Sequence, residues 1–142
     1  MNFIALMLAT FLAPYLLYAF SFLFERVPPL NDVLLYGYWL QQMQLGDPLL
    51  GLTQDFVYPY PSLLPMWLAQ VIGGPAGILV GWTTLIAVLN SLAIGALTSW
   101  GKGGRGPMLT GVFWVTFLLL LGPSGIGRID AVAAAVSVDR KS

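Results

Sequence analysis

The feature that most constrains the fold is a set of long apolar runs without charged side chains. Phe3 to Leu23 is one such run, and Ala76 to Trp100 is another. A helix needs about 20 apolar residues to cross a bilayer, so both runs are long enough. Only 8% of all residues are charged, whereas soluble domains carry roughly a quarter. The sequence therefore predicts an all-α integral membrane protein.

Shorter apolar stretches complete one predicted membrane domain, residues 1–142. A third, slightly short span follows Pro107, and a last apolar stretch stops at about half a span. We therefore expect the chain to be part of a longer protein. A cleaved signal peptide is the alternative for the first run, although that run lacks a positive start. The predicted segments are spans at 3–24, 76–100 and 108–122, a cytoplasmic loop at 101–107 and the start of a fourth span at 129–138.

A polar loop, residues 25–75, separates the first two spans and is predicted to hold two interfacial helices, 32–45 and 60–72. Asn31 is a good N-cap for the first helix, Asp32 suits its first turn, and Gly46 suits its end. Val33, Tyr36, Leu40 and Met43 recur there at helical spacing, with Gly37 and Trp39 alongside. The loop also contains the acidic residues Glu25, Asp47 and Asp55.

The orientation of this loop depends on residues 63–72. They cover only about half a span, which favours an interfacial helix over a short transmembrane one. Lys102 and Arg105 then lie inside, as the positive-inside rule requires, and the loop lies on the outer face of the plasma membrane. Asp32, Arg128 and Asp130 would share that face. If residues 63–72 cross the membrane instead, Asp32 and Asp130 lie on opposite sides.

Composition excludes several kinds of chemistry. The chain has no Cys and no His, so thiol nucleophiles and zinc sites are excluded, and no metal or cofactor is expected. Its net charge is zero without a basic stripe, which argues against a nucleic-acid partner. Any catalysis must use carboxylates, Arg, Lys, Tyr or backbone groups.

Three ionisable residues at the ends of predicted membrane segments form the candidate site. Asp32 is the candidate general base, and Arg128 and Asp130 are the candidate phosphate- and substrate-binding pair. The alternative is structural: Asp32 caps a helix, while Arg128 and Asp130 reach the headgroups or pair with each other. Asn90 is expected to form a hydrogen bond within the membrane. The Gly77/Gly81 pair can mark close helix contact, but we favour its interpretation as ordinary membrane-helix glycine.

The order of motifs resembles the start of the GT-C class of membrane glycosyltransferases, closest to the actinobacterial, mannosyltransferase-like family 87. The motifs lie in order along nearly the whole chain: Asn31-Asp32-Val33, Tyr36, Leu45-Gly46-Asp47-Pro48, Tyr58-Pro59-Tyr60-Pro61-Ser62-Leu63 and Gly127-Arg128-Ile129-Asp130-Ala131-Val132.

The resemblance implies sugar transfer, typically with inversion, from a polyprenyl-phosphate sugar to a hydroxyl on a lipid or glycan acceptor. It implies that Asp32 acts as base and that Arg128 and Asp130 face the same cavity. The chain departs from the family by stopping after three and a half spans, so it is expected to be inactive alone. A non-catalytic membrane protein that acts as an assembly partner is the alternative, and a transporter fragment is a weaker one because paired broken helices are not evident.

Overall fold

The computed structural model describes residues 3–24, 30–46, 56–99 and 105–137, and all regular secondary structure there is helical. Glu25, Asp47, Asp55 and Lys102 lie outside the described residues. The elements are α1 (Phe3–Phe24), α2 (Asn31–Gln44), η1 (Tyr60–Ser62), α3 (Leu63–Gly73), η2 (Gly74–Ala76), α4 (Ile78–Ser99), α5 (Arg105–Leu121), α6 (Ser124–Gly127) and α7 (Asp130–Val136).

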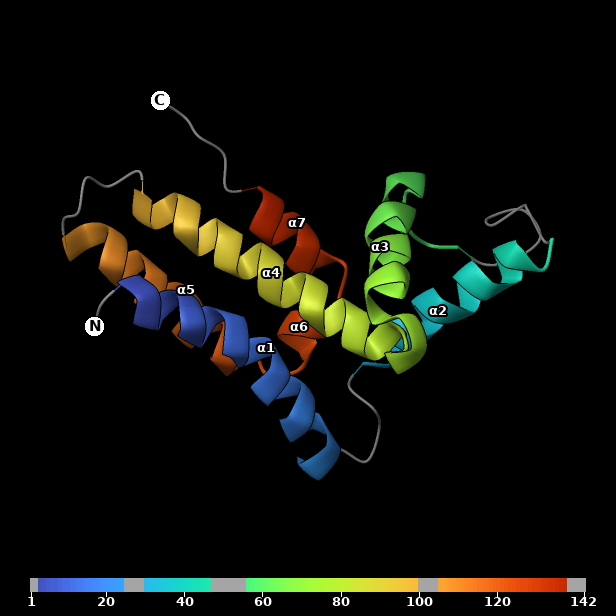
Figure 1. Cartoon of the computed structure of the whole chain (residues 1–142), viewed down its shortest axis with the longest axis horizontal. Helices are drawn as coiled ribbons and strands as arrows, with labels where there is room; N and C mark the ends of the chain where they lie inside the picture. The colour runs from blue at the N-terminus through green and yellow to red at the C-terminus, as the bar shows by residue number, and fades with distance from the viewer. Residues whose placement is uncertain (1–2, 25–29, 47–55, 100–104, 138–142) are drawn as a thin grey trace.

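Helix α4 is the centre of a bundle with α1, α5 and α7 (Figure 1). The Tyr15 hydroxyl of α1 donates a hydrogen bond to Thr84 Oγ1 of α4 at 2.9 Å. On α5, Trp114 Nε1 donates to Asn90 Oδ1 of α4 at 2.7 Å. The expected hydrogen bond at Asn90 is therefore present. It joins two helices within an apolar region, where few other polar partners exist.

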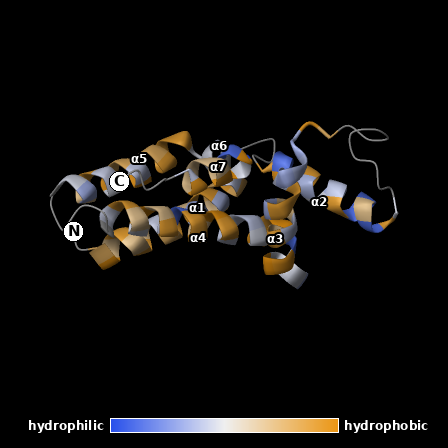
Figure 2. Cartoon of the chain, turned by 90° about the horizontal axis from the view of Figure 1, so that it is seen from above, coloured by the Kyte–Doolittle hydropathy of each residue, from blue (hydrophilic) through white to orange (hydrophobic). Residues whose placement is uncertain are grey.

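Two described helices are long and apolar enough to cross a membrane, Phe3–Leu23 and Ile78–Thr98. Helix α5 is a shorter apolar helix, Gly106–Leu121. Hydrophobic residues dominate these helices, whereas hydrophilic residues gather on α2 (Figure 2). Length and composition thus support membrane association, and they mark two of the three expected spans.

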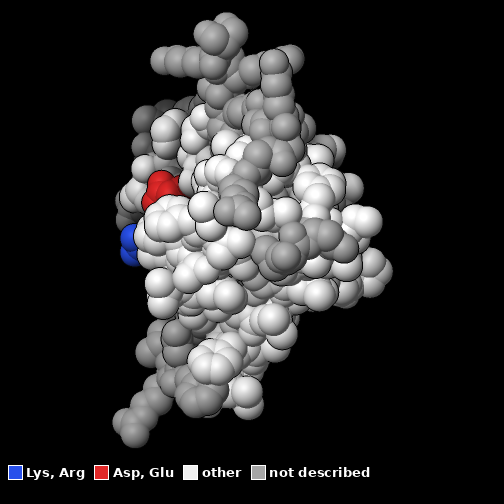
Figure 3. All heavy atoms as spheres, turned by 90° about the vertical axis from the view of Figure 1, so that its left-hand side faces the viewer, with Lys and Arg blue, Asp and Glu red and all other residues white. Residues whose placement is uncertain are grey.

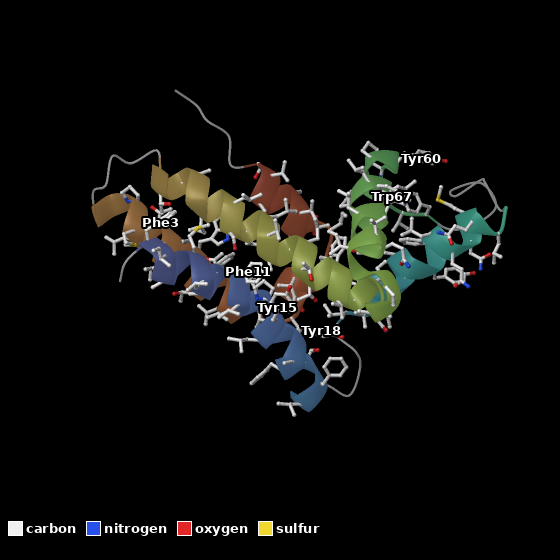
Figure 4. All side chains as sticks on the ribbon, viewed as in Figure 1. Phe3, Phe11, Tyr15, Tyr18, Tyr60 and Trp67 are labelled. Carbon is white, nitrogen blue, oxygen red and sulfur yellow. The ribbon has the colours of Figure 1, made fainter. Side chains whose placement is uncertain are left out.

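Helices α2 and α3 run across the direction of α4 and form a V whose point lies at the start of α4 (Figure 1). Tyr60 lies toward the end of α3 that is farther from α4, with Trp67 along that helix (Figure 4). Both aromatic side chains are exposed. This exposure is typical of aromatic residues at a membrane–water interface.

The contact between α3 and α4 corrects the expectation for the glycine pair. A Cβ atom at Gly81 would overlap the carbonyl oxygen of Ala69 and lie 2.6 Å from the amide nitrogen of Gly73. Gly81 is therefore required for close helix packing, and its interpretation as ordinary glycine is wrong. Gly77 precedes the helix at φ 88°, with open space around it. Gly81 therefore permits close helix packing, whereas Gly77 provides a backbone conformation with positive φ.

Three details of helix boundaries and faces also differ from expectation. The N-cap of α2 is the buried Leu30, whose carbonyl accepts from Val33 N, because packing of Leu30 in the core fixes the start of the helix. Met43, the last residue of the helical repeat, is 40% exposed, whereas the neighbouring Trp39 is buried with the rest of the repeat. Helix α5 begins at Arg105, inside the expected loop at 101–107, since Pro107 is tolerated in a first helical turn.

The break after α5 also contains an element that was not expected. Gly122 adopts φ 64° and ends α5, and the one-turn helix α6 follows at once. Helix α7 then begins at Asp130, with Arg128 just before it, as predicted. This segment returns the chain to α4 and α2, where the candidate site lies.

Candidate functional site

Asp32 and Arg128 lie side by side, as the predicted outer-face arrangement requires. Arg128 Nε is 3.9 Å from Asp32 Oδ2. Asp32 lies in the first turn of α2, and Arg128 has an extended backbone between α6 and α7. Their side chains are 45% and 68% exposed. An ion pair this exposed contributes only about 0–1 kcal/mol to stability, so other contacts must hold the two segments together.

Two hydrogen bonds to buried aromatic side chains fix the position of Arg128. The Ile129 N–H donates to the Tyr36 hydroxyl of α2 at 3.1 Å. Trp82 Nε1 of α4 donates to the Ile126 carbonyl at 2.7 Å. Tyr36, Trp82 and Ile126 are fully buried. Arg128 therefore lies on a short segment that is anchored on both sides, and its neighbour Ile129 is bonded to the helix that carries Asp32.

Tyr36 is also the centre of an aromatic cluster that joins the loop to the bundle. Its ring lies 5.0 Å from that of Trp82, 5.8 Å from that of Tyr58 and 6.2 Å from that of Trp39. Burial raises the pKa of the Tyr36 phenol well above its ordinary value, and a hydrogen bond with Tyr58 and the nearby Asp32 charge raise it further. Tyr36 is therefore neutral at physiological pH and cannot serve as a base there.

A cavity of about 420 Å³ opens beside Arg128 and Asp130. Most of its wall is apolar and comes from α5 and α7, with Asn90 of α4 as a further polar group. Asp32 does not line this cavity, although its carboxylate contacts Arg128 from outside it. Arg128 is thus the residue that connects the apolar cavity with the carboxylate on α2.

The arrangement suits a ligand with an apolar body and an anionic head. A guanidinium binds phosphate through charge-assisted hydrogen bonds. A carboxylate beside it can accept a proton from a hydroxyl group. One side of the molecule shows a small acidic and a small basic area among its described residues (Figure 3). The described residues contain no group of His, Cys, Asp or Glu able to hold a metal.

Sequence reasoning missed the groups that position the site. Trp82 and Trp114 lie within apolar runs, where a tryptophan reads as a simple hydrophobic residue. The available signal was the indole N–H, which needs an acceptor when it is buried. Both indoles have one: the carbonyl of Ile126 and the side chain of Asn90.

Comparison of the chain with protein-family models, with curated proteins and with solved structures finds no match. The geometry of the site is therefore the basis for a functional proposal, together with the resemblance of the sequence motifs.

Proposed function

We propose that this chain is the N-terminal part of an integral membrane glycosyltransferase. Its donor is a polyprenyl-phosphate sugar with a mannose-like sugar, and its acceptor is a hydroxyl group on a lipid or glycan. Arg128 binds the donor phosphate and Asp130 binds the substrate at the wall of the cavity, and Asp32, which contacts Arg128 from outside the cavity, is the general base. The contact between Asp32 and Arg128 is the observation that carries the proposal, because it joins a proton acceptor to a phosphate-binding group.

The cavity supports a donor that carries a long hydrocarbon chain. Apolar groups line most of its surface, and Arg128 and Asp130 lie at its wall. A prenyl chain can lie along the apolar residues while its phosphate reaches Arg128. The leaving phosphate would then lie near the side of Arg128 that contacts Asp32, where an acceptor hydroxyl could lose its proton.

The proposed orientation places this reaction on the outer face of the plasma membrane. In this topology α1, α4 and α5 are the three spans, α7 starts a fourth, and α2 and α3 are interfacial helices. Two observations support it: α3 runs across α4 instead of along it (Figure 1), and Arg128 lies against the loop helix α2. The Lys102 and Arg105 segment then lies inside, in agreement with the positive-inside rule.

A transfer assay on the intact gene product tests the proposal. Wild-type protein in lipid vesicles should release polyprenyl phosphate from polyprenyl-phosphate mannose when membrane lipid extract is supplied as acceptor. Arg128→Ala should raise the donor KM about ten- to hundred-fold, because charge-assisted hydrogen bonds are worth about 1.5–3 kcal/mol. Gln42→Ala, which removes an uncharged side chain elsewhere on α2, is the control. Absence of transfer by folded wild-type protein from polyprenyl-phosphate mannose and other sugar donors would reject the proposal.

A non-catalytic assembly partner is the second candidate, and one observation favours it. Exposed apolar side chains follow one face of α1, at Ile4, Leu8, Leu12 and Leu16. Such a face can pack against lipid or against a helix of another protein. This candidate predicts that Ile4→Ser and Leu8→Ser disrupt the complex of this chain with its partner protein. It also predicts that cells with Arg128→Ala have the wild-type phenotype.

A further inference from the structure

The V between α2 and α3 borders a second, open cavity of about 470 Å³, which differs chemically from the first. Both helices are held at the start of α4: a Cβ atom at Gly37 would lie 3.1 Å from the Ile78 side chain, and Gly73 packs against Gly81. Beyond these contacts the helices diverge. The described lining comes from α2, where Leu34 and Leu40 accompany the glutamines, and from Gln70 of α3. The volume lies within the size range of ligand pockets, about 300–1,000 Å³.

Three glutamine side chains define the chemistry of this cavity. Gln41 and Gln44 line it from α2, and Gln70 lines it from α3. Within the described part of the chain, no hydrogen bond joins any of these three amides to another side chain. The Tyr38 ring, which is 47% exposed, lies on the same wall. None of the lining residues that the structure describes is charged.

An uncharged set of amides selects a particular class of ligand. Each amide offers two N–H donors and a carbonyl acceptor, so three amides can bind groups that both donate and accept. Hydroxyl groups have this property, while phosphates and ammonium groups call for an opposite charge. An exposed tyrosine adds an apolar ring face and a hydroxyl. We propose that this cavity binds a neutral saccharide.

This saccharide site is separate from the Asp32 contact with Arg128. Gln41 follows Asp32 by nine residues, about two and a half helical turns, which places the two side chains on opposite sides of α2 and about 13 Å apart along it. The proposal therefore stands independently of sugar transfer. It assigns a function to the glutamine-rich end of α2, Gln41-Gln42-Met43-Gln44.

Calorimetric titration of the full chain in lipid nanodiscs tests this site. Mannotriose and maltotriose are the neutral probes, and a trisaccharide of hexuronic acids is the charged comparison. We expect a neutral probe to bind wild type, the uronic acid probe to bind at least ten-fold more weakly, and Gln41→Ala/Gln44→Ala to weaken neutral binding at least ten-fold. Gln42→Ala, a glutamine that does not line the cavity, should bind like wild type.

Circular dichroism confirms that each variant is folded before titration. Repeating the titration in nanodiscs that contain a neutral glycolipid separates two sources of the saccharide. If the glycolipid weakens binding of the neutral probe, the ligand is a lipid headgroup. If probe binding is unchanged, the ligand is a free glycan. Failure of both neutral probes to bind folded wild type would overturn the proposal. Equal binding by the double variant and Gln42→Ala would overturn it as well. Neither result depends on the activity of Asp32.

Discussion

The backbone N–H of Ile129 donates a hydrogen bond to the Tyr36 hydroxyl, 93 residues earlier in the chain. This bond joins the start of α7 to the loop helix α2. It places the preceding residue, Arg128, against Asp32. Because the ion pair itself is exposed and weak, the buried tyrosine determines the geometry of the candidate site.

Removal of the Tyr36 hydroxyl should loosen this connection. Tyr36→Phe keeps the ring in the aromatic cluster but leaves the Ile129 N–H without its acceptor, so we expect a loss of about 1–3 kcal/mol in unfolding free energy. Denaturation of the purified protein in detergent measures it. Tyr38→Phe, at an exposed position on the same helix, is the control and should have little effect. Equal effects of the two variants would show that the Ile129 bond contributes nothing.

The same tyrosine predicts a response to alkaline pH. Its pKa is raised in the folded protein, so the unfolded chain loses the phenolic proton first, near its ordinary pKa of about 10. Stability contributed by the neutral phenol is complete below that pH and decreases as pH rises above it. Tyr36→Phe should have a flatter profile of unfolding free energy between neutral pH and pH values above 10. Identical wild-type and variant slopes would contradict this assignment.

Two glycines of α4 provide a matched test of the packing against α3. At Gly81 an added Cβ overlaps the Ala69 carbonyl, whereas at Gly95 it meets only the flexible Met7 side chain at 3.6 Å. Gly81→Ala should destabilise by about 1–3 kcal/mol, as overpacked positions do. Gly95→Ala should be neutral or stabilising by up to about 1 kcal/mol, because alanine favours helix. Thermal unfolding measures the stability of both variants. A Gly81→Ala variant as stable as Gly95→Ala would refute the close contact between α3 and α4.

The Asn90 and Trp114 pair should stabilise the contact between α4 and α5. Asn90→Leu leaves the Trp114 N–H without its acceptor, and Trp114→Phe removes the donor. Interhelical hydrogen bonds in membranes average about 0.6 kcal/mol and reach about 1.7 kcal/mol. A double-mutant cycle isolates this coupling energy. We expect a value within that range, and strictly additive effects would show that the pair is not coupled.

Helix positions follow from the sequence because apolar runs, glycine and proline mark them locally. Gly46 ends the segment after α2 at φ 93°, and Asp130 opens α7 as its spacing from Arg128 suggested. The V of α2 and α3 could not be predicted, since it depends on contacts at Gly37 and Gly81 between distant segments. Similarly, the charged residues Asp32 and Arg128 can be identified from the sequence. The hydrogen bond from Ile129 to Tyr36, which places them next to each other, cannot. Their catalytic roles stay predictions.

We propose that Asp32 acts as the base in sugar transfer beside a phosphate bound by Arg128. The most direct measurement is kcat for transfer from polyprenyl-phosphate mannose, determined for the intact gene product and its Asp32→Asn variant. Loss of a general base lowers rates about 10²–10⁴-fold. We predict a decrease of that size in kcat, with the donor KM changed less than in Arg128→Ala. Asp32→Asn protein that retains wild-type kcat would contradict the account.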